Sequence, residues 1–225
     1  MLIRDWMTKE VITVGPETSM MKASKLMREH KISRIPVVDD SFRLLGIVSD
    51  RDLKEASPSK ATSLDMHELY YLLSEIKVKD IMTKTPLAVK PTETVEKAAV
   101  LMMNNHFGGL PVVDENLKVV GIITDSDVFK VLVNITGITE GGVQLAFSLP
   151  NAEGSLKAII DDLKEYNARI ISVLTSFTHA DEGHRSVYIR IQDPDKAVLN
   201  DMVAKLSSKY TLLYWVRDNL NPIIP

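Results

Sequence analysis

Hydrophobic residues recur at helical spacing in two stretches of the first half of the chain. The apolar positions are Met20, Ala23, Leu26 and Met27 in one stretch and Val95, Ala98, Leu101 and Met102 in the other. This spacing predicts two amphipathic helices, with Thr18 and Thr92 close to their N-caps. Short apolar runs flank each helix and predict strands over residues 11–14, 35–38 and 44–48, and over residues 87–89, 110–113 and 119–123.

The two helices belong to an internal repeat. Residues 3–53 align with residues 78–128 without a gap when the chain is shifted by 75 positions, and 18 of the 51 aligned residues are identical. A further helix is predicted to begin at Ser49 and at Thr124, which gives each copy the element order β-α-β-β-α. One such unit leaves a face of its sheet uncovered, so we expect the two copies to pack against each other.

Both copies place a hydroxyl and a carboxylate at the start of their last helix, as Ser49-x-x-Asp52 and Thr124-x-x-Asp127. The N–H groups and the dipole of a helix N-terminus favour phosphate. A carboxylate one turn into the helix can accept hydrogen bonds from the two hydroxyls of a ribose. The same spacing is also that of a capping box, which needs no ligand. The residues alone therefore leave two interpretations open, a nucleotide site or a helix cap.

The residues around these helix starts define two candidate nucleotide sites. The first comprises Ile12, Val14, Arg34, Ile35, Pro36, Ser49, Asp50, Arg51 and Asp52, and the second comprises Leu87, Val89, His106, Leu110, Pro111, Thr124, Asp125 and Asp127. Arg34 and Arg51 would supply positive charge to the first site, and the apolar residues could enclose a flat base. Two glycines, Gly108 and Gly109, replace the Ser-Arg pair in the second copy. We therefore expect the second site to be roomier and less charged, with His106 as its nearest donor.

The tandem pattern of Pro-Val-Val-Asp followed by Gly-Ile-Val-Ser-x-x-Asp resembles a CBS domain pair, also called a Bateman module. The resemblance covers residues 1 to about 133. It implies that AMP, ADP, ATP or a related adenosine compound binds between the repeats. It also implies that Asp52 and Asp127 bind ribose and that Ser49 and Thr124 contact phosphate. Arg34 matches the family's basic residue, which has no counterpart in the second copy.

The last third of the chain predicts a second α/β domain. Strands are expected over residues 143–149, 169–178, 187–191 and 210–216, and helices over 155–166 and 195–206. The order βαββαβ is that of a ferredoxin-like fold. The loop Asn151-Ala-Glu-Gly-Ser-Leu156 resembles the ligand loop of ACT domains, where Asp-x-Pro-Gly-x-Leu is usual. The candidate ligand residues are Asn151, Gly154 and Leu156. The resemblance implies an amino-acid ligand, and a domain that serves only to dimerise is the alternative.

The order of these segments is similar to that of acetoin-utilisation AcuB-type proteins. We expect CBS repeat 1 over residues 1–56, an inter-repeat segment over 57–77 with a packing helix over 64–76, CBS repeat 2 over 78–134, a linker over 135–142 and an ACT domain over 143–218. The fold class is α/β (α+β), a CBS pair followed by a ferredoxin-like domain.

Composition narrows the function classes. The 225 residues carry a net charge of −3 without a basic block, which disfavours a nucleic-acid partner. Cysteine is absent, so disulfides and thiolate metal sites are excluded. The N-terminal stretch lacks the apolar core of a signal peptide and no apolar run approaches a membrane span, so we expect a cytoplasmic location and no membrane partner.

The sequence contains none of the catalytic motifs that we sought. A P-loop, Gly-x-Gly-x-x-Gly and Gly-x-Ser-x-Gly are all missing. His179 and His184 flank a turn with Asp181, and we interpret this turn as solvated and not as a metal site. We therefore predict a homodimeric regulatory protein with no catalytic residue, no catalytic cofactor and an adenine nucleotide as regulatory ligand. The alternative is a structural oligomerisation module without a ligand.

Overall fold

The computed structural model describes residues 1–57, 74–218, 220 and 221, and the chain divides into two compact units. Unit 1 spans Met1–Phe129 and unit 2 spans Lys130–Pro225. Most of the predicted inter-repeat helix over residues 64–76 lies outside the described residues. None of the helices in the described ranges is both long and apolar enough to span a bilayer.

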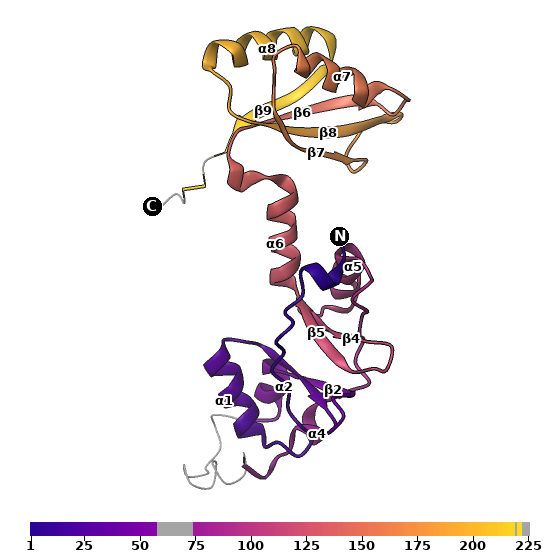
Figure 1. Cartoon of the computed structure of the whole chain (residues 1–225), viewed down its shortest axis with the longest axis vertical. Helices are drawn as coiled ribbons and strands as arrows, with labels where there is room; N and C mark the ends of the chain where they lie inside the picture. Colours follow the sequence, from indigo (N-terminus) through magenta and orange to yellow (C-terminus); the bar gives the residue numbers. More distant parts are fainter. Residues whose placement is uncertain (58–73, 219, 222–225) are drawn as a thin grey trace. The chain divides into compact units, whose positions relative to one another are not determined.

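Unit 1 contains the two repeats (Figure 1). Its elements are η1 (Ile3–Asp5), α1 (Met20–His30), β1 (Arg34–Val38), β2 (Leu44–Ser49), α2 (Asp50–Glu55), α4 (Val78–Ile81), β3 (Thr83–Lys84), α5 (Val95–Asn105), β4 (Gly109–Val113), β5 (Val119–Thr124) and the first part of α6 (Asp125–Thr136). Both predicted amphipathic helices are present as α1 and α5. Their N-caps are Ser19 and Thr94, one and two residues beyond the predicted threonines.

The two repeats exchange their lead-in segments. β1 and β2 pair antiparallel, and β3, which precedes the second repeat, adds to β2 as a third strand. In return, Thr8 of the first lead-in forms a single antiparallel bridge with Ile122 of β5. The β-turns of the two copies also meet, because Leu44 N donates to Leu117 O at 3.0 Å. The two copies therefore contact each other, as expected, and they do so through backbone hydrogen bonds at the edges of their sheets.

The strands predicted over residues 11–14 and 87–89 are reduced to single parallel bridges, Val14 to Val37 and Val89 to Val112. Proline explains this correction. Extending the first bridge in either direction would require an N–H donor from Pro36 or from Pro16, and proline has none. Two aligned prolines, at positions 111 and 91, limit the second bridge in the same way.

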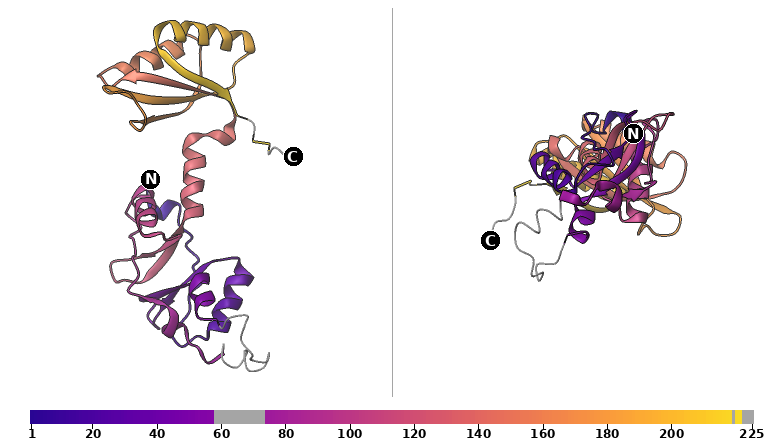
Figure 2. Two further views of the ribbon diagram at one scale, coloured as in Figure 1. Left: turned by 180° about the vertical axis from the view of Figure 1, so that it is seen from behind. Right: turned by 90° about the horizontal axis from the view of Figure 1, so that it is seen from below.

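Unit 2 is a four-stranded antiparallel sheet with both of its long helices on one face (Figures 1 and 2). After the end of α6 and η2 (Ile138–Glu140) come β6 (Val143–Pro150), α7 (Ser155–Lys164), β7 (Ile170–Ser176), β8 (His184–Ile191), α8 (Lys196–Lys209) and β9 (Thr211–Arg217). This is the predicted βαββαβ order, and the strand order in the sheet is β7-β8-β6-β9. The core lies between sheet and helices and includes Phe147, Ile159, Ile189 and Met202.

The segment predicted as a linker, residues 135–142, is a packed turn of unit 2. α6 continues to Thr136, and η2 follows one residue later. Gly137 has φ +63°, and a Cβ there would lie 2.3 Å from Ile171 Cγ2. Gly142 has φ +84°, and a Cβ there would lie 2.1 Å from Ile191 O. These glycines allow close approach to the sheet, so the segment expected as a linker packs against the strands of unit 2.

Candidate functional site

The start of α2 is a complete capping box. The Ser49 N–H and the Ser49 hydroxyl both donate to Asp52 Oδ2, each at 2.7 Å, and the Asp52 N–H donates back to Ser49 Oγ at 3.3 Å. The capping interpretation of this motif is therefore confirmed for the first repeat. One carboxylate oxygen of Asp52 serves the cap, which leaves Oδ1 of this half-buried side chain for another donor.

The start of α6 repeats the same geometry. The Thr124 N–H and hydroxyl donate to Asp127 Oδ2 at 3.0 and 2.8 Å, and the Asp127 N–H donates to Thr124 Oγ1 at 3.4 Å. Asp127 is only 4% exposed, whereas Asp52 is partly exposed. The two helix starts thus share one hydrogen-bond pattern and differ in how far the carboxylate is accessible.

Arg34 connects the two helix starts. Its backbone is the first residue of β1 and lies opposite Ser49 in the β1–β2 register. Its guanidinium lies against the second repeat, because a Cβ added to Gly108 would be 2.3 Å from Arg34 Nη2 and one added to Gly109 would be 2.4 Å from Nη1. The room expected in the second site is therefore filled by the arginine of the first. This arginine also brings a positive charge towards Asp125 at the start of α6.

The guanidinium of Arg34 has hydrogen-bonding capacity to spare. Nη2 donates to Ser33 Oγ at 3.4 Å, and Nη1 is buried without a partner among the described residues. Burial lowers the pKa of Arg34, and the carboxylates of Asp125 and Asp50 act in the opposite direction. Each of these two aspartates is the first residue of its helix. A cation with an unused donor therefore faces the starts of both helices.

The other charged residues of the first site are engaged on the surface of α2. Arg51 Nε donates to Glu55 Oε1 at 2.8 Å, and Lys54 Nζ donates to Asp50 Oδ2 at 2.8 Å. The hydrogen bond from Lys54 is the main cause of the lowered pKa of Asp50. In the second repeat, His106 is exposed and ends α5 in the left-handed conformation with φ +55°.

Most of the predicted apolar site residues belong to the core of unit 1. Val14, Ile35, Pro36, Val89, Leu110 and Pro111 are buried, while Ile12 is partly buried and Leu87 is exposed. Ile35, for example, is fully buried and packs in the cluster that includes Ala23 and Val48. The buried residues form the core that supports the helix starts. Of the predicted apolar site residues, only Ile12 and Leu87 are substantially accessible to solvent.

Comparison with known proteins identifies the repeat. The family model described as CBS domain matches residues 3–59 and 78–134, which together make up half of the chain. This chain belongs to the CBS domain family. The two matches are the two repeats that the sequence alone revealed, so unit 1 is a CBS pair. Residues after 134 lie outside the family match.

Relatives of two lengths share the CBS pair. A CBS domain-containing protein of Dictyostelium discoideum is 33% identical over 134 residues, which is 60% of this chain and 92% of that protein. Homoserine O-acetyltransferase of Methanosalsum zhilinae is 34% identical over 132 residues, but the chain spans only 24% of that enzyme. The similarity to the enzyme is therefore confined to a part of it.

Solved structures include similar CBS pairs. A putative acetoin utilization protein (AcuB) from Vibrio cholerae is 31% identical with a TM-score of 0.52, over 62% of this chain and 96% of that one. CBSX2 from Arabidopsis thaliana is another similar CBS-pair protein, and one of its structures is a complex with AMP. The AMP complex is 36% identical with a TM-score of 0.50, over 60% of this chain and 98% of that chain.

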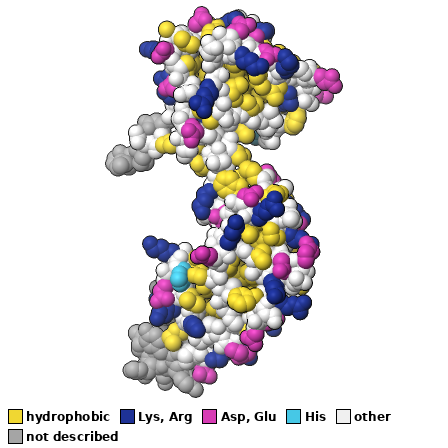
Figure 3. All heavy atoms as spheres, in the orientation of Figure 1, with side chains coloured by type: hydrophobic (Ala, Val, Ile, Leu, Met, Phe, Trp, Pro, Cys, Tyr) yellow, Lys and Arg dark blue, Asp and Glu magenta, His cyan; other side chains and the backbone are white. Residues whose placement is uncertain are grey.

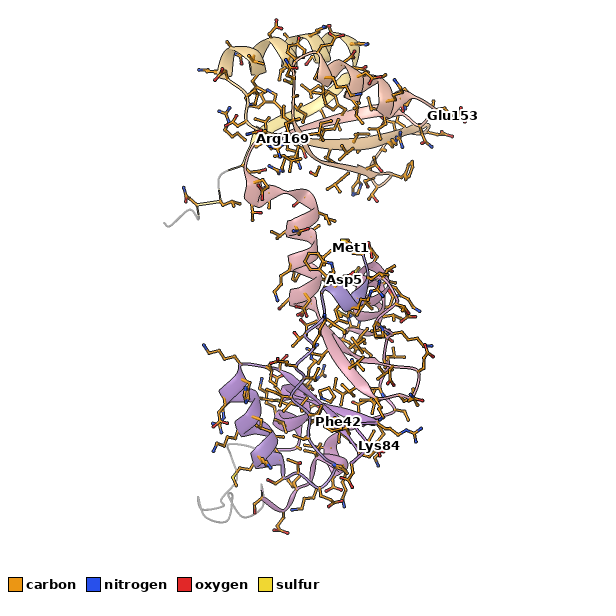
Figure 4. All side chains as sticks on the ribbon, in the orientation of Figure 1. Met1, Asp5, Phe42, Lys84, Glu153 and Arg169 are labelled. Carbon is orange, nitrogen blue, oxygen red and sulfur yellow. The ribbon has the colours of Figure 1, made fainter. Side chains whose placement is uncertain are left out.

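The loop after β6 belongs to unit 2. The Asn151 N–H donates to Gly183 O at 2.8 Å, which ties this loop to the β7–β8 turn. Gly154 is the N-cap of α7 with φ +81°, and Leu156 packs against the core of unit 2. Figure 4 shows Glu153 at one end of the sheet and Arg169 at the opposite end. Of the three predicted ligand residues, Asn151 and Gly154 are exposed, whereas Leu156 contributes to packing.

The histidine turn of unit 2 has no sign of a metal centre. His184 Nδ1 lies 3.1 Å from Glu182 O, and His179 has φ +61°. Within the described ranges, no group of three or more His, Cys, Asp or Glu side chains is arranged to hold a metal ion.

Sequence reasoning missed the role of Arg34 in the second repeat. The signal was present, because the Gly108-Gly109 pair aligns with Ser33-Arg34 in an otherwise regular repeat. A glycine that replaces a larger residue at an aligned position of a repeat indicates that another group approaches the backbone there, because glycine has no side chain to block it. The sequence did not show that the approaching group is the guanidinium of Arg34, the residue of the first repeat that aligns with Gly109.

Proposed function

We propose that the CBS pair binds an adenine nucleotide and that the protein is a regulatory sensor of that ligand rather than an enzyme. The observation that carries this proposal is the buried Nη1 of Arg34, which has no hydrogen-bond partner in the described part of the chain and lies beside two hydroxyl-carboxylate helix starts. A guanidinium in this position suits a phosphate. The structure of CBSX2 with AMP, a similar CBS pair, supports an adenosine ligand.

The proposed roles follow from the geometry. Ser49 and Thr124 would present hydroxyls to phosphate, and Asp52 and Asp127 would accept hydrogen bonds from ribose hydroxyls. Each carboxylate already binds its own helix start through Oδ2. The same residue would therefore cap the helix in the absence of a ligand and help to bind the ribose in its presence. Capping and binding are compatible interpretations of one motif.

Isothermal calorimetry of the full chain with AMP, ADP, ATP and adenosine tests the proposal. We expect binding of at least one of the four, and Asp52→Ala should weaken it about 10- to 100-fold, because hydrogen bonds to a charged group contribute about 1.5–3 kcal/mol. Asp80→Ala is the matched control. Asp80 Oδ2 accepts from the Lys77 N–H at 3.1 Å at the start of α4, so this variant also loses a cap. Absence of binding to the wild-type chain across the panel would overturn the proposal.

We further propose that unit 2 is an ACT-type domain. The βαββαβ order, the strand order β7-β8-β6-β9 and the glycine at the start of α7 support this assignment. Its ligand would be an amino acid bound near Asn151 and Gly154. A thermal-shift screen of the full chain against the twenty amino acids tests this, since a ligand of the folded state raises its stability by mass action.

A second candidate function is oligomerisation by unit 2 without a ligand. Strand β9 exposes a run of large apolar side chains, namely Leu213, Tyr214, Trp215 and Val216. Figure 3 shows hydrophobic side chains gathered on the face of unit 2 that it displays. We propose a homodimer on this basis. Light scattering at micromolar concentration should give about twice the 25.1 kDa of one chain, and a monomer mass would overturn the dimer.

A further inference from the structure

Helices α1 and α5 are the same element in the two repeats, and their buried sides match. Both helices have 11 residues, align without a gap and end at a residue in the left-handed conformation. The buried residues of the two helices occupy aligned positions, namely Met20, Ala23 and Met27 in α1 and Val95, Ala98 and Met102 in α5. Packing within each repeat therefore places the same demands on both helices.

The outer sides of the two helices differ in chemistry. Val100 and Met103 lie one turn apart on α5 and are 54% and 74% exposed. The aligned residues of α1 are Lys25 and Arg28, which are exposed as well. Since the first repeat carries charges at these positions, the fold of the repeat does not require apolar side chains there. A contact with another molecule would account for them.

The surroundings of these two residues in the chain also lack charge. Residues 98–113 contain no Lys, Arg, Asp or Glu, whereas the aligned residues 23–38 contain five. Phe107 follows α5 and is exposed, and its backbone N–H donates to a carbonyl in the last turn of the helix. We call Val100, Met103 and Phe107 the α5 surface. Figure 1 shows α5 at the surface of unit 1, next to the N-terminus of the chain.

We infer that the α5 surface is a contact between two copies of this chain, related by a two-fold axis and with their α5 helices antiparallel. An uncharged apolar surface offers no counter-charge to an acidic or basic partner, whereas a second copy matches it in charge and polarity. A two-fold contact needs only one such surface, because each copy presents the same residues to the other. The antiparallel alignment keeps the two Glu96 carboxylates at opposite ends of the contact, and a parallel one would set them side by side.

The absence of cysteine from the chain allows a direct test of proximity. In the full chain at micromolar concentration, a short bismaleimide should convert Met103→Cys to a covalent dimer, because Met103 lies in the middle of the α5 surface. Arg28→Cys is the matched control, since it places a thiol at the aligned, exposed position of α1. We expect mainly dimer from the first variant and little from the second. No dimer from Met103→Cys, or as much from Arg28→Cys, would overturn the inference.

An exchange of residues between the repeats tests the strength of the contact. Met103→Arg gives α5 the residue that α1 carries at the same place, so the variant should fold. It would bring two guanidinium groups together, and we expect the dissociation constant of self-association to rise about tenfold or more in analytical ultracentrifugation. Arg28→Met, the reverse exchange, should leave the constant unchanged.

A Tyr214→Lys background separates this contact from the one proposed for β9. The Tyr214→Lys chain should still self-associate, and Met103→Arg should then make it monomeric. A monomeric Tyr214→Lys chain, or a dissociation constant that Met103→Arg leaves unchanged, would overturn the α5 contact. Neither result would affect nucleotide binding by the CBS pair, which calorimetry measures independently.

Discussion

Arg190 Nη2 donates to Asp218 Oδ2 at 2.6 Å, and this ion pair joins the residue after β9 to β8. The Arg190 side chain is 2% exposed on β8, and its other nitrogens donate to Thr136 O at 3.1 Å and to Gly141 O at 3.2 Å. The end of α6, the turn after it and the residue after β9 thus converge on one buried guanidinium. This cluster explains why residues 135–142 are packed against unit 2.

Arg190→Met should destabilise unit 2 by about 3 kcal/mol, because it leaves two carbonyls and a carboxylate without their shared donor. Urea denaturation can follow unit 2 through Trp215 fluorescence in a Trp6→Phe background, since the chain has two tryptophans. Arg217→Met is the control. Its ion pair with Asp193 has the same 2.6 Å length but is about half exposed on both sides, so a loss of at most about 1 kcal/mol is expected. Equal losses would show that burial of Arg190 is unimportant.

Gly46→Ala should destabilise unit 1 more than Gly121→Ala, although the two glycines are aligned in the repeat. A Cβ at Gly46 would lie 2.8 Å from Thr83 O, which is backbone in β3, and 2.6 Å from Met82 Sδ. At Gly121 the contacts are to the flexible Met7 side chain alone. We expect about 1–3 kcal/mol for the first variant and less for the second, from urea midpoints followed by circular dichroism. The reverse order would contradict the strand exchange as described.

Gly142→Ala should destabilise unit 2 more than Gly141→Ala. Both residues have positive φ, so each substitution strains the backbone by about 1 kcal/mol or more. Only Gly142 approaches the sheet, where its Cβ would meet Ile191 O, whereas a Cβ at Gly141 meets nothing within 4 Å. Thermal denaturation of the two variants measures the difference. If both lowered the melting temperature equally, the close contact with β8 would be excluded.

Acid should loosen the helical layer of unit 2 between about pH 4 and pH 2. Hydrogen bonds from Lys157 and Lys164 lower the pKa of Asp161 to about 2. Those from Lys209 and Tyr210, at 2.7 and 2.5 Å, lower the pKa of Asp162 as well. A carboxyl whose pKa is lowered by folding stabilises the folded state above its unfolded pKa, near 4, and loses this contribution as the pH falls through its folded pKa.

Urea midpoints measured from pH 6 to pH 2 and carboxyl titration by NMR test this expectation. The midpoint should fall over that range, and Asp162→Asn should lower it at pH 6 and flatten its fall. Lys157→Met should raise the pKa of Asp161 towards its ordinary value. A titration of Asp161 near pH 4 in the wild-type chain would contradict the lysine contacts.

The sequence by itself determined the repeat, the amphipathic helices and the two helix starts. These features depend on local chemistry. The spacing of Met20, Ala23 and Met27 makes one face of a helix apolar in any context. Ser49 and Asp52 form their cap within four consecutive residues, so the motif predicts its own geometry.

Only the tertiary structure decided what lies beside these helix starts. The position of the Arg34 guanidinium against Gly108 and Gly109 joins residues about 75 positions apart, and a long side chain can turn to either repeat until packing fixes it. The same holds for Arg190, whose partners at Thr136 and Asp218 flank almost the whole of unit 2. A sequence pattern records which residues share a helix face or a strand. It does not record which distant backbone a buried cation will meet, because that depends on how the folded elements pack.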